Sequence, residues 1–159
     1  PVDVVQAMQK QIAALTAQQA TDALRGKVTA ALADGRLLPA MQGWAEAQLA
    51  GTADQRAALS SYIDAAVPML DMVPPECADL IRAVRILEQM RRAGRPVLVC
   101  CALGYGRSAA VVLLWLWAYG GCADLDAAVA RLRQVRPQMV LPDAVRQSIQ
   151  TAKREMEQA

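Results

Sequence analysis

The apolar positions in the first third of the chain recur three or four residues apart, set among glutamines and alanines. This spacing predicts one long amphipathic helix from residue 2 to about 24, which could pair with another chain. The helix continues over 27–33 until Asp34 and Gly35 break it. The apolar residues that carry the pattern are Val5, Met8, Ile12, Leu15 and Leu24.

Two further helices are predicted before residue 66. Pro39 can start a helix that carries Trp44 and ends at Gly51. Thr52 suits the N-cap of the next helix, which runs to about Ala65, because its hydroxyl can accept a backbone hydrogen bond. No alternating or β-branched run occurs in this region, so we expect no strand there.

The pattern changes after residue 66. Val67 to Asp71 is a short apolar run that ends in an acid, and Val97 to Val99 is a second short run after a proline. Both are typical of buried strands. Between them, Pro74 and Pro75 precede a helical stripe that Gly94 closes. The order of strand, acid-bearing loop, helix and strand predicts an α/β core with its site at the strand ends.

The remainder of the chain is expected to be helical. A strongly apolar helix opens at Ser108 and ends at Gly120 and Gly121. Asp124 can cap a helix that runs through Arg133, and Pro142 can open a last helix toward Met156. These helices would cover the sheet.

The composition excludes several classes of enzyme and binding site. Histidine is absent, which excludes Cys-His proteases, Ser-His-Asp hydrolases and histidine-ligated zinc. The net charge of +2 is too small to indicate a nucleic-acid or membrane partner. We find no signal peptide, and the longest apolar run, 109–119, is too short to cross a bilayer. We therefore expect a soluble, cytoplasmic protein with reduced cysteines and no metal or cofactor.

The stretch from Cys101 to Ser108 carries the candidate chemistry. Cys101 follows the second predicted strand, and Arg107 and Ser108 open the apolar helix. The two glycines between them, Gly104 and Gly106, allow backbone N–H groups to turn inward as an anion-binding nest. The helix N-terminus and the planar guanidinium of Arg107 favour an anion at the same place, and they favour thiolate over thiol at Cys101.

This segment, Cys-Ala-Leu-Gly-Tyr-Gly-Arg-Ser, resembles the signature loop of the cysteine-dependent protein tyrosine phosphatases, and most of all their dual-specificity branch, including small bacterial members. The resemblance covers about residues 66–158. It implies a catalytic domain over 66–159 with an α/β strand-loop-helix core. Because the region 1–65 shows no strand pattern, we expect a reduced sheet preceded by a mainly helical region.

The resemblance also implies roles for individual residues. Cys101 would attack phosphorus and Asp71 would protonate the leaving group, while Ser108 would donate a hydrogen bond to the cysteine sulfur. Asp64 is a rival acid, but its helical spacing favours a solvated face. The phosphate oxygens would be held by Arg107 together with the loop amides of Ala102, Leu103, Gly104, Tyr105 and Gly106.

One residue departs from the family pattern. Cys100 stands where the family usually has a histidine next to its nucleophile, which puts the reactivity of Cys101 in question. Adjacent strand residues point apart, so we expect Cys100 to be a buried filler with redox protection as a minor role. The uncharged loop side chains Ala102, Leu103 and Tyr105 favour a singly phosphorylated substrate.

Several alternatives remain open at the level of sequence. The loop could serve a phosphate-binding module without turnover, or a sulfurtransferase or arsenate-reductase-like thiol enzyme, although the Arg-Ser ending and the placement of Asp71 disfavour the latter. The segment 31–45 resembles the end of protease/scaffold proteins of Mu-like prophages. An alanine-rich helical appendage explains it equally well.

Overall fold

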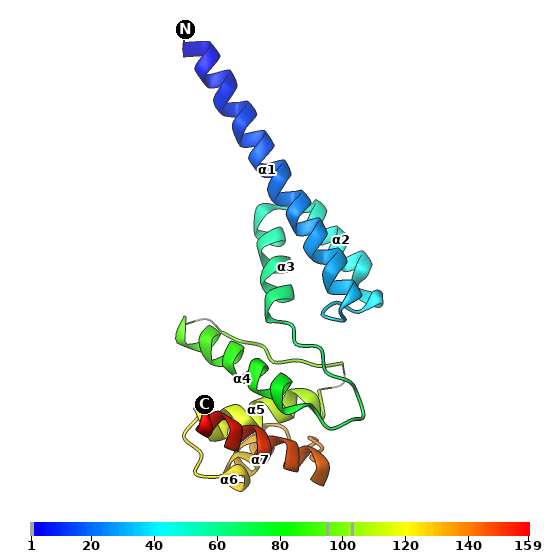
Figure 1. The fold of residues 1–159 in the computed structure, drawn as a ribbon, viewed down its shortest axis with the longest axis vertical. Helices are drawn as coiled ribbons and strands as arrows, with labels where there is room; N and C mark the ends of the chain where they lie inside the picture. The colour runs from blue at the N-terminus through cyan, green and yellow to red at the C-terminus, as the bar shows by residue number, and fades with distance from the viewer. Residues whose placement is uncertain (1, 95, 103) are drawn as a thin grey trace. The chain divides into compact units, whose positions relative to one another are not determined.

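The computed structural model describes residues 2–94, 96–102 and 104–159. The chain divides into two compact units, Pro1–Ala66 and Val67–Ala159. Within the described residues every regular element is a helix (Figure 1). None of these helices has both the length and the apolar character needed to cross a membrane.

The first unit contains the helices that the sequence pattern predicts. They are α1 (Val2–Ala33), the short 3-10 helix η1 (Pro39–Met41), α2 (Gln42–Ala50) and α3 (Ala53–Ala65). Thr52 caps α3 as expected: its hydroxyl accepts the Gln55 N–H at 3.3 Å, and the Gln55 side chain accepts the Thr52 N–H at 2.7 Å. This capping box satisfies two backbone donors at the helix start.

A small apolar core holds the first unit together. Lys27 on α1 reinforces it by donating to Ser60 at 2.8 Å and to Asp64 at 2.6 Å, both on α3. The residues of α1 that take part in this packing lie in its C-terminal half (Figure 1). The buried residues of this core are Leu24, Val28, Ala31, Leu37, Ala45, Leu59 and Ile63.

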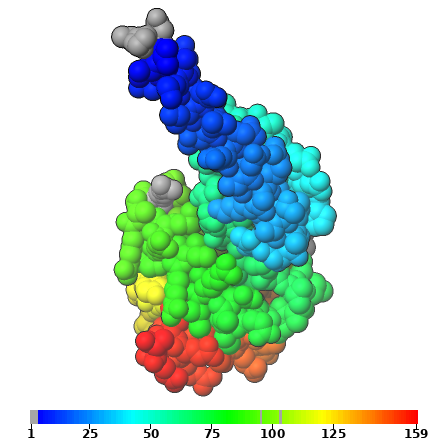
Figure 2. Space-filling view, turned by 45° about the horizontal axis from the view of Figure 1, so that its top comes forward, coloured from blue at the N-terminus to red at the C-terminus, as the bar shows by residue number. Residues whose placement is uncertain are grey.

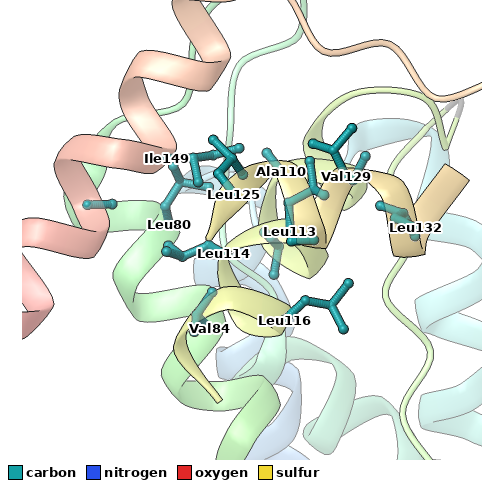
Figure 3. Close-up of a cluster of buried hydrophobic side chains, with 14 of the residues drawn as sticks. Leu80, Val84, Ala110, Leu113, Leu114, Leu116, Leu125, Val129, Leu132 and Ile149 are labelled. Atoms are coloured by element: carbon teal, nitrogen blue, oxygen red, sulfur yellow. The ribbon is translucent and has the colours of Figure 1, made fainter. Parts of the chain in front are cut away.

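The second unit is built around one apolar helix. It contains α4 (Cys77–Arg92), α5 (Arg107–Ala118), α6 (Leu125–Val135) and α7 (Asp143–Gln158). Helix α5 packs against α4, α6 and α7, and its leucines Leu113 and Leu114 are fully buried among side chains of the other three (Figure 3). Because α5 is surrounded, the loop that leads into its N-terminus is held by a packed core.

A buried carboxylate also joins α4 to α5. Glu88 is 6% exposed and accepts hydrogen bonds from Arg91 at 3.2 Å, Arg92 at 2.7 Å and the Trp115 indole at 2.9 Å. The hydrogen bonds from Arg91, Arg92 and Trp115 lower the pKa of Glu88 to about 2. The carboxylate therefore stays charged and partnered at neutral pH.

The α/β fold predicted from the sequence is wrong. The two expected strands, within 67–71 and 97–99, are irregular segments, and the described residues contain no sheet. A strand needs a neighbour to pair its backbone groups, and the regular elements within residues 2–65 are all helices. Instead, Met69 and Val99 pack their side chains onto the helical core. The unit is mainly helical.

Candidate active site

Cys101 lies just before the N-terminus of α5 and contacts two groups of the following loop. Its Sγ accepts the Gly104 N–H at 3.2 Å and lies 3.4 Å from the Ser108 Oγ. Ser108 is 9% exposed in the first turn of α5. A backbone donor, a hydroxyl and a helix N-terminus therefore surround one sulfur, an arrangement that favours negative charge on it.

The loop between Cys101 and α5 needs glycine at one position in particular. Gly104 has a φ of +73°, which side chains rarely allow, and a Cβ there would lie 2.8 Å from Arg136 Nη2. Gly106 is the N-cap residue of α5. The chain conformation that brings the Gly104 N–H to the sulfur thus depends on the absence of a side chain at this residue.

The connection between α6 and α7 holds this loop from the other side. Arg136 Nη2 donates to the Gly104 carbonyl at 3.2 Å, and the Val140 N–H donates to the Tyr105 carbonyl at 3.0 Å. Both contacts engage carbonyls of the loop rather than its N–H groups. The α6–α7 connection is therefore a structural part of the site.

Arg107 joins the loop to the segment after the first unit. Its Nη1 donates to the Met69 carbonyl at 3.0 Å and its Nη2 lies 3.1 Å from the Asp71 Oδ2. Its Nε is buried and finds no acceptor among the described residues. A buried guanidinium donor without a partner is costly, and an oxyanion oxygen would satisfy it.

The structure brings most of the predicted site residues together. Gly104 and Ser108 both contact Cys101, and Asp71 pairs with Arg107, the residue before Ser108 in the first turn of α5. Ala102 and Tyr105 are exposed beside them, and Gly106 caps the helix. Leu103, predicted to contribute an amide, lies outside the described residues.

The structure agrees with the sequence prediction for Asp64 but not with the one for Cys100. Asp64 pairs with Lys27 on α1 and is largely exposed, as expected of a solvated helix face. Cys100 is exposed, so the prediction of a buried filler is wrong. Its segment is not a strand, and therefore the strand alternation on which that prediction relied does not apply.

Cys77 is a poor rival nucleophile. Burial, followed by the negative charges of Glu155 and Glu76, raises the pKa of this thiol. A thiol with a raised pKa is mostly protonated at neutral pH and reacts slowly. The geometry thus favours Cys101 over Cys77.

Sequence reasoning missed two groups. The Met69 carbonyl holds Arg107, and Arg136 holds Gly104 from 32 residues further along the chain. Every residue has a main-chain carbonyl, so the residue type does not indicate which carbonyl will hold an arginine. Arg136 follows α6 and precedes Pro137, which indicates a turn but not the place to which that turn returns. Both contacts follow from tertiary packing.

A cysteine, a hydroxyl and an arginine lie at the N-terminal side of α5, an arrangement whose chemistry suits an oxyanion. The model of the family described as dual specificity phosphatase, catalytic domain, matches residues 46–154. This is well over half of the chain and includes every residue of the site, so the chain belongs to that family. No solved structure matches the chain.

Proposed function

We propose that this protein hydrolyses phosphate monoesters through a cysteinyl-phosphate intermediate on Cys101. The observation that carries the proposal is the buried Nε of Arg107, which has no partner among the described residues, in the same segment, 101–108, as a sulfur that accepts the Gly104 N–H. A phosphoryl group bound to the sulfur would offer an oxygen to that donor. Membership of the phosphatase family supports the same chemistry.

In the first step the Cys101 thiolate attacks phosphorus. The S–P bond forms as the P–O bond to the leaving group breaks, and Asp71 gives its proton to the departing oxygen. The Gly104 N–H stabilises the thiolate before it attacks, and the Arg107 guanidinium stabilises the charge that spreads over the remaining phosphoryl oxygens. The product is an alcohol or phenol, with the phosphoryl group on sulfur.

In the second step water attacks the phosphocysteine. The O–P bond forms, the S–P bond breaks, and Asp71 takes the proton of the water. Ser108 Oγ, 3.4 Å from the sulfur, donates a hydrogen bond to the departing thiolate and so lowers its basicity. Inorganic phosphate leaves and the starting state of the enzyme returns.

The ion pair between Arg107 and Asp71 suggests how substrate binding prepares the acid. Bidentate binding of a phosphate needs two parallel guanidinium N–H groups, and Nε is unengaged while Nη2 faces Asp71. As Nη2 turns to the phosphate, it loses its hold on Asp71. The released carboxylate then takes up a proton from solvent, which it can give to the leaving oxygen.

We propose a singly phosphorylated substrate, such as a phosphotyrosine, phosphoserine or phosphothreonine residue of a protein. The side chains of Ala102 and Tyr105 at the loop are uncharged, so the loop itself offers no additional cation for a second phosphate. Arg136 is the one guanidinium that the α6–α7 connection adds beside Gly104 in the described part of the chain, and there it holds a carbonyl.

The test is turnover of para-nitrophenyl phosphate by the parent chain, Cys101→Ser and Cys100→Ser. Cys101→Ser should lose turnover completely because its hydroxyl stays protonated at neutral pH. Cys100→Ser is the matched control, since the exposed neighbouring thiol should be dispensable. Loss in the control with retention in Cys101→Ser would contradict the assignment.

A phosphate-binding module without turnover is the second candidate. It is favoured by Arg107, because both of its terminal nitrogens already have partners, and by the exposed Cys100 in place of the family histidine. Vanadate or phosphate binding by the parent chain without any turnover of aryl phosphates would support this alternative. Measurable turnover that depends on Cys101 would exclude it.

A further inference from the structure

The N-terminal half of α1 presents an apolar stripe that no described residue of the first unit covers. Residues 4–20 are all exposed, and Figure 2 shows the blue start of α1 standing clear of the cyan helices of the same unit. The large apolar side chains on it are between 55% and 62% exposed. They are Val4, Val5, Met8, Ile12 and Leu15.

Packing within the first unit contributes little to the stability of this exposed half of α1. An isolated helix of this length is marginal in water, and most helical stability in proteins comes from packing of an apolar face. In α1, buried packing residues begin at Leu24 and continue with Val28 and Ala31. The exposed half carries enough apolar area to be stabilised by a partner that covers it.

The stripe has the register of a coiled-coil seam. Val5 and Ile12 are seven residues apart, as are Met8 and Leu15, and the two pairs are offset by three, the a and d positions of a heptad. β-Branched residues fall at a, while leucine and methionine fall at d. This distribution favours a parallel coiled coil of two helices over trimers and tetramers.

The e and g positions beside the seam are compatible with association of two identical chains. Gln9, Gln11, Thr16 and Gln18 occupy the e and g positions next to the seam, and none is charged. Two copies in parallel would therefore place no like charges against each other. We propose that a second copy of this chain covers the stripe, forming a parallel two-stranded coiled coil over residues 5–15.

The seam is short, so the association should be reversible. Gln19 occupies the next a position and Asp22 the next d position, and both are poor core residues. Two apolar heptads bury a small area compared with a stable interface. We expect a monomer–dimer equilibrium that responds to protein concentration.

Sedimentation equilibrium of the full chain over a wide concentration range tests the proposal. The parent chain should fit a monomer–dimer model. Ile12→Lys should raise the dimer dissociation constant about a hundredfold or more, because it removes one buried side chain from each copy and buries charge. Ala13→Lys is the matched control: it adds the same charge one residue away, at an exposed position outside the seam, and should dimerise like the parent.

Orientation is tested by disulfide formation in a Cys100→Ser background. Leu15→Cys should form an interchain disulfide quickly in a parallel dimer, where the two d positions face each other, and Ala17→Cys on the outer face should not. In an antiparallel pair residue 15 lies opposite the other end of the seam. Slow or equal cross-linking of the two variants would overturn the parallel arrangement.

Three results would overturn the proposal as a whole. They are a parent chain that stays monomeric at every concentration, a trimer or larger assembly, and an Ile12→Lys variant that dimerises like the parent. In the first case another partner or another segment covers the stripe. The outcome is independent of the phosphatase proposal, since turnover per chain is measured separately and the residues assigned to catalysis, Asp71, Cys101, Arg107 and Ser108, all belong to the second unit.

Discussion

Arg107 and Asp71 form an ion pair, with the Arg107 Nη2 3.1 Å from the Asp71 Oδ2. The arginine belongs to the first turn of α5, and the aspartate to the irregular segment that precedes α4. The contact places the candidate general acid next to the candidate phosphate ligand before any substrate binds. A substitution at either residue can therefore affect both proton donation to the leaving group and phosphate binding.

Asp71→Asn should separate general-acid catalysis from positioning. We expect hydrolysis of alkyl phosphates to slow by about 10²–10⁴-fold, whereas aryl phosphates with good leaving groups should lose much less, because their leaving oxygens need no proton. Initial rates on the two substrate classes give the comparison. Asp64→Asn, which removes an exposed partner of Lys27, should leave both rates close to those of the parent. Equal losses on both classes would show that Asp71 only positions Arg107.

Arg107→Lys should impair the enzyme although it keeps the charge. Lysine cannot present two parallel N–H groups to a phosphate, and it cannot reach the Met69 carbonyl and an oxyanion together. We expect a fall in kcat/KM of about 10²–10³-fold, the cost of removing a preorganised oxyanion donor. Arg133→Lys, an exposed exchange in the last turn of α6, is the control. A fully active Arg107→Lys would mean that only charge is needed.

The two loop glycines should respond differently to alanine. Gly104→Ala has a positive φ of +73° and a Cβ position 2.8 Å from Arg136 Nη2, so it should lose stability, by about 1–2 kcal/mol from the backbone alone. It should also lose turnover, because its N–H would move from the Cys101 sulfur. Gly106→Ala meets no atom within 4 Å and should be milder on both counts. Urea unfolding and turnover of both variants provide the test, and similar losses would contradict this account of the loop.

The Glu88 network predicts a dependence of stability on pH. The pKa of this carboxyl falls from the ordinary 4.5 to about 2 on folding, so its contribution is fully present above pH 4.5 and is lost as the pH falls toward 2. Glu88→Gln should therefore be less stable than the parent at neutral pH, with a difference that shrinks between pH 4.5 and 2. Glu155→Gln, an exposed change on α7, should show no such trend. Urea unfolding at several pH values measures both.

The helices could be predicted from the sequence because their signals are local. Helical spacing and caps such as Thr52 and Asp124 act within a few residues, and both caps accept the expected backbone N–H groups. The grouping of Cys101, Gly104 and Ser108 was predictable for the same reason, because its ends are only seven positions apart in the sequence. The family is confirmed by the match over residues 46–154.

The parts that failed depend on contacts between distant segments. Short apolar runs such as Val97 to Val99 are compatible with a strand or with a packed irregular segment, and only the presence of a pairing partner decides between them. The wrong prediction that Cys100 is buried had the same cause, because it assumed a strand at this segment. Arg136 could not be assigned to the site because its contact with Gly104 depends on how α6 and α7 pack around α5.

The most direct test of the central claim is to trap the covalent intermediate. Ser108→Ala should slow departure of the Cys101 thiolate, so that phosphocysteine accumulates during turnover of an aryl phosphate. Acid quenching on the millisecond scale followed by peptide mass spectrometry should locate the phosphoryl group on Cys101, and the Ser108→Ala/Cys101→Ser variant should carry none. A phosphoryl group on another residue, or continued turnover with Cys101 never modified, would contradict the mechanism.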